Sequence, residues 1–413
     1  MSASTLTTFS AFLKKMYSKD KVEAIGLTSA RPFLTKLKKN KDFGGESLVV
    51  PVIHAGPQGI SGNFASAQSN ASNLKGKAFT VTCGALYGVV EVGDQVLKAS
   101  RNNAGAFLNN KTAEIEYTME GLYNELSAQV WRGNGGLAIG QRGSISGNIV
   151  TLSDPDDVQN FEEGMTVVAS DATGRGSSDA LRTGSTTVAS VDREAGTVTL
   201  TDQSAITNFA NSDYLFRQGC FAGNTTVQML YGVNDYIYSS SSSVPNLYGM
   251  VRTSDPSRLA GIRVATSQLS GLGASERIME LLTQMSGRHK VSGMDECWVS
   301  PSVWNQIAIE QMSKGIKPHD DTTGIVGLKA IDILAGGSVV RCYADPHVPS
   351  STAFVINSKV WELSSMGELI TFDGEDGLQL LRKASSTDYE IRFMSYSALI
   401  CRAPGFNGRV SIA

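Results

Sequence analysis

Residues 44–77 have the sequence GGESLVVPVIHAGPQGISGNFASAQSNASNLKGK, and this stretch decides the fold. Residues 46–54 are rich in β-branched side chains and predict a strand, and residues 77–83 predict the strand that returns. Pro51 has no N–H for a β-ladder, so the first strand is expected at a sheet edge or at a bulge. Residues 55–75 between the strands are rich in Gly, Ser, Asn and Ala and are expected to form a loop.

This predicted β-arm is longer than a compact monomer needs. Residues 46–54, fully extended, span about 30 Å, and the tip has few apolar residues to bury against its own domain. Structureless loops of more than about 12–15 residues are uncommon without a function. A long surface loop of a monomer is the alternative, but the pattern favours an arm that lies on a neighbouring subunit.

A long amphipathic helix is predicted over residues 104–131. Its apolar residues recur at steps of mostly three and four and make one buried stripe: Leu108, Ile115, Met119, Leu122, Leu126 and Val130. The acidic residues Glu114, Glu116, Glu120 and Glu125 fall mainly off that stripe. Gly133–Gly136 is expected to end the helix. At about 40 Å, such a helix suits the spine of a scaffold better than a small globular core.

Length and charge limit the possible classes of protein. The 413 residues are enough for two or three domains. Charged residues make up 18%, below the roughly 25% of typical soluble domains. Fewer charges fit a surface partly covered by partners, although a monomer rich in Ser and Thr would look the same. The net charge of −3 excludes a strongly basic nucleic-acid binder as a description of the whole chain.

The first 41 residues are basic in contrast, with nine basic residues, two acidic ones and a net charge of +7. Apolar residues at helical spacing between Phe9 and Tyr17 predict an amphipathic helix, followed by a basic arm. Such arms contact nucleic acid or an acidic neighbour, and a solvated, frayed terminus is the equal alternative. The candidate contact residues of this arm are Lys14, Lys15, Lys36, Lys38 and Lys39.

Cysteine usage and hydropathy bear on the compartment. The five cysteines are single, have no CxxC spacing and are expected to be buried, reduced thiols of a protein made in a cytosol. The first ten residues are uncharged and rich in Ser and Thr, unlike a signal peptide. No apolar run reaches 18 residues, so no membrane span and no membrane partner is expected.

Residues 140–219 differ from the sequence around them. They contain short strand patterns separated by Gly, Pro and Asp, and predict an all-β module, a small barrel or sandwich. Because a mixed pattern resumes afterwards, the module has the character of an inserted domain. Two helices, 274–287 and 303–312, are then predicted, with strands at 296–299, 339–343, 353–356, 361–363, 389–393, 399–402 and 409–412.

No convincing active site emerges from the motifs. The four histidines lack metal-ligand spacing. His319-Asp320-Asp321 could be a ligand cluster, but a polar loop is the stronger interpretation, and turn residues explain Asp154, Asp156 and Asp157 better than a calcium loop does. There is no dinucleotide fingerprint, P-loop or nucleophile elbow. We therefore expect no enzyme, with no catalytic residue, cofactor or metal.

Several soft patterns, in order along most of the chain, carry a family resemblance. They are residues 86–92 and 99–107, which lead into the long helix, 246–252 followed by Asp255-Pro256, 298–301 before the Trp304 helix, 345–349, and 389–392 with 403–408. In this order, the chain resembles the major capsid proteins of tailed bacteriophages. The resemblance implies an α+β fold of the Hong Kong 97 type, with an N-arm, an extended β-loop, a spine helix, peripheral and axial domains and an inserted β-barrel.

The resemblance also implies domain boundaries. They are 1–43 for the N-arm, 44–77 for the extended loop, 78–139 for the peripheral domain with the spine helix, 140–219 for the inserted barrel, 220–256 for more of the peripheral domain, 257–376 for the axial domain, and 377–413 for the C-terminal strands of the peripheral domain. Some relatives carry a large cleaved scaffolding segment before the N-arm. Only about 40 residues lie there, so a separate scaffolding protein is expected.

The implied function is that of a shell subunit. It would form pentamers and hexamers of an icosahedral head, assembled in the host cytoplasm, that encloses double-stranded DNA without sequence specificity, with portal and decoration proteins as further partners. The inter-subunit contact candidates are Phe64, Leu74, Lys75, Lys77 and Phe79. Some relatives cross-link a loop lysine to an asparagine of a neighbour, and Lys75 and Lys77 are loop lysines. An encapsulin-like nanocompartment shell and, less favoured, an enzyme with a β accessory domain remain alternatives.

Overall fold

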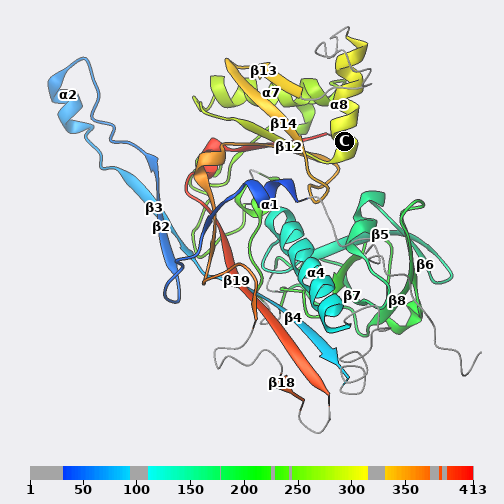
Figure 1. Ribbon diagram of the computed structural model, residues 1–413. Helices are drawn as coiled ribbons and strands as arrows, with labels where there is room; N and C mark the ends of the chain where they lie inside the picture. Colours follow the sequence, from blue (N-terminus) through cyan, green and yellow to red (C-terminus); the bar gives the residue numbers. More distant parts are fainter. Residues whose placement is uncertain are drawn as a thin grey trace, which may run out of the picture. The chain divides into compact units, whose positions relative to one another are not determined.

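The computed structural model describes residues 31–93, 110–176, 178–224, 228–240, 244–314, 331–372, 381–383 and 388–412. The chain divides into two compact units. The first contains the described parts of residues 87–124 and 370–394, and the second contains 31–86, 125–369 and 395–412. Three long elements have residues in both units: β4 (Gly84–Val92), α4 (Asn110–Arg132) and β19 (Tyr389–Cys401) (Figure 1).

The first unit contains the N-terminal part of β19, residues 389–394. This strand pairs antiparallel with two short strands, β17 (Thr371–Phe372) and β18 (Leu381–Arg382), and it also pairs with β4. The ring of Phe372 lies 4.9 Å from that of Phe393. Gly88 of β4 lies against α4, where an added Cβ would come within 2.8 Å of Leu122 Cδ1. Residue 88 therefore lets the helix approach the strand closely.

Helix α4 confirms the predicted spine helix over the part that is described, from residue 110 onward. Leu122, Leu126 and Val130 of the predicted stripe are buried. Glu125, expected off the stripe, is instead buried, at 8% exposed, and its carboxylate lies 3.4 Å from the guanidinium of Arg217. Every residue from 125 to 131 is buried, so this end of the helix is enclosed on all sides. A one-sided stripe cannot predict such burial.

The second unit contains the C-terminal part of β19, from residue 395, and the strands that pair with it. β1 (Lys38–Asn40) pairs parallel with β16 (Trp361–Ser365), which pairs antiparallel with β19. Glu362 of β16 accepts a hydrogen bond from Asn40 Nδ2 at 2.8 Å and lies 3.0 Å from the Arg402 guanidinium. The strands predicted at 389–393 and 399–402 are thus one continuous strand.

A six-stranded mixed sheet forms the next layer of this unit. The strand order is β11 (Ile262–Arg263), β20 (Gly408–Ser411), β15 (Thr352–Ile356), β12 (Glu296–Val299), β14 (Ser338–Ala344) and β13 (Ile331–Ala335). Helices α7 (Ala274–Gly287) and α8 (Pro301–Ser313) pack against it. The shared core includes Ile278, Leu281, Leu282, Met285, Ile307, Val340 and Val355.

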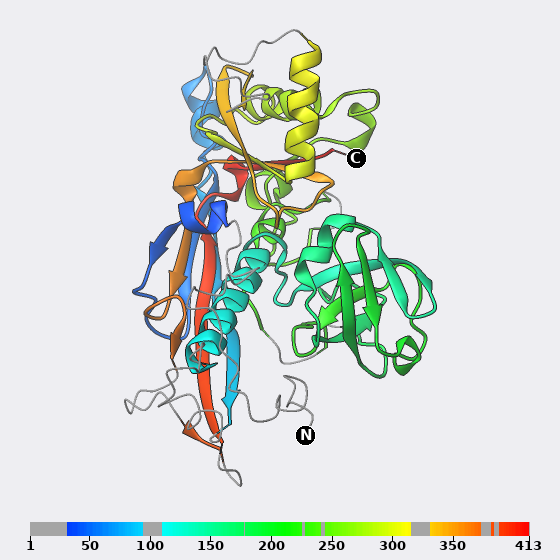
Figure 2. The same cartoon turned by 45° about the vertical axis from the view of Figure 1, so that its right-hand side comes forward.

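The all-β prediction is confirmed as a closed six-stranded barrel (Figure 2). Its strands, in order around the barrel, are β10 (Tyr214–Arg217), β5 (Ala138–Ser146), β6 (Ile149–Leu152), β9 (Thr197–Leu200), β8 (Thr186–Asp192) and β7 (Thr166–Ser170). The interior is filled by apolar side chains, among them Val150, Leu152, Phe161, Val167, Val198 and Leu215. Residues 138–219 contain five Arg, eleven acidic residues and no Lys, a net charge of −6.

Residues 31–43, expected as part of a basic arm, fold onto the body of the second unit. Phe33 and Leu34 of helix α1 (Pro32–Lys36) are buried in its core, as are Leu37, between α1 and β1, and Phe43, after β1. The Phe33 ring lies 4.2 Å from that of Trp131. The amphipathic helix expected between Phe9 and Tyr17 lies outside the described residues.

Short helical turns complete the chain. They are α2 (Phe64–Ser69), α5 (Val233–Tyr236), α6 (Pro256–Leu259), η1 (Pro155–Asn160), η2 (Gln203–Ala205), η3 (Thr266–Gln268), η4 (Ser358–Val360) and η5 (Pro404–Phe406). Among the described helices, none combines the length and the apolar character needed to cross a membrane.

Candidate assembly surface

The predicted arm is a two-stranded antiparallel hairpin that extends from the rest of the second unit (Figure 1). It is made of β2 (Leu48–Ala55) and β3 (Lys75–Val81). Pro51 pairs with Ala78, and the hairpin gains no third strand among the described residues. Each strand is therefore an edge, which explains why proline is tolerated and confirms the expectation for Pro51.

One face of the hairpin base is anchored in its own chain. Val50, Val52, Phe79 and Val81 are buried. The Phe79 ring meets Tyr236 edge-to-face at 5.6 Å, and Phe79 itself is 0% exposed. Phe79, a predicted inter-subunit contact, is therefore a core residue of its own subunit. The alternation of side chains along a strand predicts which residues share a face with Phe79, but it does not predict which face packs against the rest of the subunit.

The opposite face, the first residue of β2 and the tip of the hairpin carry large apolar side chains in contact with solvent. Phe64 is 82% exposed and Ile60 is 86% exposed, and the others are Leu48, Val49, Ile53 and Leu74. Complete burial of one such side chain is worth about 1.5–3 kcal/mol. Scattered exposed apolar residues are normal, but a series of them along one projecting hairpin indicates a surface that a partner covers. We call these six residues the hairpin surface.

Sequence reasoning identified Phe64 and Leu74 but missed four members of the hairpin surface. Val49 and Ile53 alternate with the buried Val50 and Val52, so the alternation along β2 was the signal that could have found them. Ile60 lies between Gly59 and Gly62, and the loop pattern around it does not predict a contact surface.

The tip is more ordered than a loop, because residues 64–69 form the short helix α2. The side chain of Asn63 caps this helix, with Oδ1 accepting hydrogen bonds from Ala65 N at 2.9 Å and Ser66 N at 3.3 Å. Asparagine is among the preferred N-cap residues. No residue of α2 is buried, so the helix holds Phe64 on the surface of the tip.

The predicted lysine contacts fall into three groups: lysines with partners in their own chain, exposed lysines, and lysines outside the described residues. Lys77 Nζ donates to the carbonyl of Val251 at 2.5 Å, and Lys75 is exposed where β3 begins. Lys36 Nζ lies 2.5 Å from Glu296 and 3.8 Å from the centre of the Tyr343 ring, and Lys38 lies 3.5 Å from Glu362. Lys39 is exposed. Lys14 and Lys15 lie outside the described residues.

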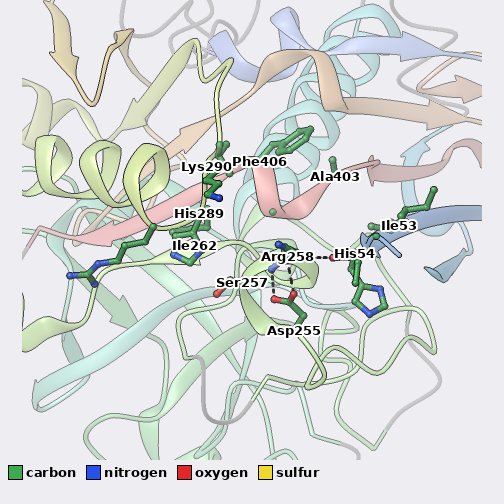
Figure 3. A pocket seen from close by; sticks show the side chains of 16 residues that line it. Ile53, His54, Asp255, Ser257, Arg258, Ile262, His289, Lys290, Ala403 and Phe406 are labelled. Carbon is green, nitrogen blue, oxygen red and sulfur yellow. Dashed lines mark hydrogen bonds and ion pairs between the residues drawn. The ribbon is translucent and has the colours of Figure 1, made fainter. Parts of the chain in front are cut away.

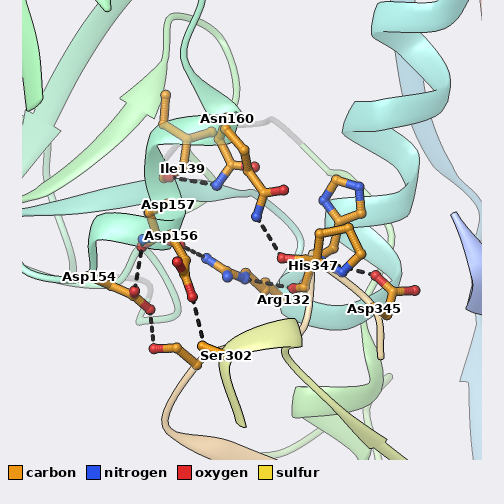
Figure 4. A network of polar contacts seen from close by, with 12 residues as sticks. Arg132, Ile139, Asp154, Asp156, Asp157, Asn160, Ser302, Asp345 and His347 are labelled. Carbon is orange, nitrogen blue, oxygen red and sulfur yellow. Dashed lines mark hydrogen bonds and ion pairs between the residues drawn. The ribbon is translucent and has the colours of Figure 1, made fainter. Parts of the chain in front are cut away.

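A polar network joins the barrel to the body of the second unit (Figure 4). Arg132, at the end of α4, forms an ion pair with Asp157 of η1, and its Nε donates to the carbonyl of His347 at 2.9 Å. Gln159 Nε2 donates to the carbonyl of Pro346 at 2.6 Å. Burial raises the pKa of Asp157, and the neighbouring Arg132 opposes that rise. We call this set of contacts the barrel junction.

Asp154 and Asp156 also contribute to the barrel junction. Ser302 Oγ donates to Asp156 at 3.0 Å, Ser350 Oγ donates to Asp154, and Asp154 accepts from the N–H of Asp156 at 3.1 Å. These aspartates thus begin and hold η1, as turn residues were expected to do. On another side, Arg175 of the barrel forms an ion pair with the buried Asp235 of α5, whose pKa is raised to about 6 by burial.

The titratable groups of the described residues show no arrangement suited to acid–base or metal chemistry. No group of three or more His, Cys, Asp or Glu in this part of the chain could hold a metal ion. Burial, together with Arg132 and Arg31, lowers the pKa of His347 to about 4, so its ring is neutral at pH 7. Burial raises the pKa of Cys83 to about 11 and that of Cys220 to about 12, which keeps both as thiols. His319, Asp320 and Asp321 lie outside the described residues.

Comparisons with known proteins place the fold. No protein-family model and no curated protein matches the sequence. The structure is similar to a chain of the cyanophage A-1(L) capsid asymmetric unit, at 11% identity and a TM-score of 0.58, covering 98% of both chains. It is also similar to a chain of the capsid of the native GTA particle, at 8% identity and a TM-score of 0.51, covering 100% of this chain and 99% of that one.

The protein therefore has the fold of a viral shell protein. More particularly, it has the Hong Kong 97-type fold of the major capsid proteins of tailed bacteriophages, which confirms the resemblance inferred from the sequence. Its extended β-loop is the hairpin β2–β3, its spine helix is α4, and its inserted domain is the closed barrel.

Proposed function

We propose that this chain is the major capsid subunit of a tailed-phage head and assembles with itself into pentamers and hexamers of an icosahedral shell around double-stranded DNA. The observation that carries the proposal is the hairpin surface, six large apolar side chains held away from their own core by a hairpin anchored at its base. Permanent assemblies bury about 2,000–5,000 Å² per interface, and a projecting hairpin adds such area efficiently.

In this proposal the hairpin lies on the adjacent subunit, which covers Ile60, Phe64 and Leu74, while unpaired strand edges are available for backbone hydrogen bonds. The axial domains meet around five- and six-fold axes and close rings. The basic residues before position 30 face the packaged DNA or a neighbouring subunit. The domain boundaries inferred from the sequence, a separate scaffolding protein, a portal and decoration proteins belong to the same proposal.

The test removes the tip of the hairpin and keeps its base. Because Ala55 pairs with Lys75, residues 56–74 can be replaced by Asn-Gly, a two-residue turn that suits a hairpin. We expect a protein with unchanged thermal unfolding that forms no shells, measured by size-exclusion chromatography and electron microscopy beside the full chain. Particles of normal size from the shortened protein would contradict the role of the hairpin surface.

The contents of the particles distinguish a phage head from an encapsulin-like shell, and the oligomeric state distinguishes both from an enzyme. A phage head shell produced with its packaging partners contains DNA that resists nuclease, whereas an encapsulin-like shell contains a cargo protein. A full-length protein that stays a monomer or dimer under all assembly conditions would favour the enzyme. The polar junction that fixes the barrel to the body fits a subunit of fixed shape, which a shell needs.

A further inference from the structure

A groove runs along the base of the hairpin (Figure 3). It has a volume of about 650 Å³ and lies between the end of β2, helix α6, the segment after α7 and the turn η5. All of these elements belong to the second unit. Since the groove begins where the hairpin leaves the body, any subunit that covers the hairpin surface passes close to it.

Among the described residues, the one carboxylate that lines the groove already has a cationic partner. Asp255 accepts a hydrogen bond from the N–H of Arg258 at 3.1 Å and lies 3.6 Å from Nε of the same residue. Arg258 Nη1 also donates to the carbonyl of His54 at 2.5 Å, which ties α6 to the hairpin. Arg258 and Asp255 therefore form the wall of the groove and leave it little net charge from this side.

Two further cations give the groove its positive charge. Arg288 and Lys290 follow α7 and are both exposed. Arg288 Nη1 donates to the neutral side chain of Gln284 at 3.3 Å, so this contact does not compensate its charge. Between them, burial lowers the pKa of His289, while the carboxylate of Asp255 raises it and the guanidinium groups of Arg288, Arg263 and Arg258 lower it. The positive charge of the groove therefore comes from the exposed Arg288 and Lys290.

Apolar groups lie beside these cations. Ile53 and Phe406 are exposed at the rim, at 65% and 45%, and Val52, Ile262 and Val291 form the buried floor. A groove with two uncompensated cations next to exposed apolar side chains matches a peptide segment with a carboxylate among apolar residues. Phosphate alone would leave Ile53 and Phe406 in water.

We propose that this groove receives a carboxylate-bearing segment of a second copy of this chain, an inference that rests on the proposed function. The chain itself supplies suitable partners, because residues 138–219 have a net charge of −6 and the remaining residues one of +3. Opposite charges of this kind select the orientation in which two subunits meet, more than they add affinity. The groove thereby sets how a neighbour approaches the hairpin.

The first experiment uses a zero-length carbodiimide, which joins an amine to a carboxylate only where the two are in contact. Particles assembled from a mixture of ¹⁴N- and ¹⁵N-labelled chains distinguish links between chains from links within one chain. We expect a mixed-isotope peptide that joins Lys290 to a carboxylate, found in particles and lost in dissociated subunits. Links from Lys290 within its own chain only, or none, would overturn the proposal.

The second experiment reverses the charges of the groove. R288E/K290E is expected to lower particle yield more than about tenfold, with thermal unfolding of the unassembled subunit unchanged. Lys359→Glu, an exposed lysine in η4 outside the groove, is the control. Normal yield from R288E/K290E overturns the proposal, as does an equal loss from Lys359→Glu, since assembly would then respond to net charge alone.

Nucleic acid is the alternative ligand of the groove, and it predicts a different result for R288E/K290E. If R288E/K290E forms particles in normal yield that retain less DNA, the groove holds phosphates and the proposal is wrong. Failure of the proposed function is distinct, because the unaltered chain would then form no shell. Shells that form without a cross-link from Lys290 would contradict the proposal for the groove but not the proposed function.

Discussion

The carboxylate of Glu310, on α8, lies across the start of α7, where its Oε1 accepts a hydrogen bond from the N–H of Ala274 at 2.7 Å. Its Oε2 accepts from the N–H and the hydroxyl of Ser275, at 2.9 and 2.7 Å. The first N–H groups of a helix have no partner within it, and together they attract negative charge. One helix of the sheet-covering pair thus caps the other.

Glu310→Gln should lower the free energy of unfolding by about 1 kcal/mol at pH 7. Partial burial acts to raise the pKa of Glu310, but the hydrogen bonds from Ser275 and Ala274 hold it below the ordinary value of 4.5. A lowered pKa in the folded state stabilises the protein above the unfolded pKa, and this stabilisation is lost as the pH falls. The difference between the two proteins should therefore shrink below about pH 4.5, as measured by urea denaturation. Glu163→Gln, at an exposed position, is the control.

Phe79 and Phe64 form a matched pair on the same hairpin. Phe79→Ala removes a fully buried ring from contact with Tyr236 and should cost about 3–5 kcal/mol of stability. Phe64→Ala removes an exposed ring and should change stability by less than about 0.5 kcal/mol, while particle yield falls because the partner loses an apolar contact. Denaturation curves measure the stability of both variants, and particle counts measure their assembly. Equal stability losses would mean that the tip is folded against its own chain.

The ion pair between Arg132 and Asp157 predicts how firmly the barrel is held. Asp157→Asn leaves a buried guanidinium without its carboxylate and should cost about 3–5 kcal/mol. Glu162→Gln breaks the exposed pair with Arg193 and should cost about 0–1 kcal/mol. Urea denaturation measures both, and hydrogen exchange should show faster opening of residues 155–160 in Asp157→Asn alone. Similar behaviour of the two variants would argue against a structural role for the barrel junction.

Asn63 gives a local prediction at the tip of the hairpin. Asn63→Ala removes the cap of α2 and should favour its opening by about 1 kcal/mol, seen as faster hydrogen exchange over residues 64–69. Global unfolding should not change, because no residue of α2 is buried. Asn63→Asp keeps an acceptor at the cap and should preserve protection. Unchanged exchange in Asn63→Ala would show that α2 does not depend on its cap.

The sequence predicted the hairpin, the long helix and the inserted β-module because each is set by local periodicity. β2 begins within two residues of the predicted strand, and Leu122, Leu126 and Val130 of the predicted stripe of α4 are buried. Turn residues between short strands were enough to predict an all-β module. Barrel closure, by contrast, depends on the pairing of β10 with both β5 and β7, which lie far from it in the sequence.

The sequence could not predict the contacts that decide which face of the hairpin is buried, how α7 is capped and how the barrel is joined to the body. Phe79 lies on the predicted returning strand, but no local pattern shows that Tyr236 covers its ring. The capping of Ala274 by Glu310 and the pairing of Arg132 with Asp157 join residues 36 and 25 positions apart. No periodicity spans such distances. The helix α2 did leave a signal, an asparagine before a run of small residues, but glycines on both sides favoured a loop.

The barrel begins and ends at one place on the body. Ala138, where β5 starts, pairs with Phe216 near the end of β10, and the N–H of Leu137 donates to the carbonyl of Cys220 at 2.9 Å. The chain thus leaves the body and returns to it through neighbouring backbone positions. A single recombination event in the gene could exchange this segment for another that provides the contacts of the barrel junction. The sequence of the barrel can consequently change separately from that of the strands and helices on either side of it.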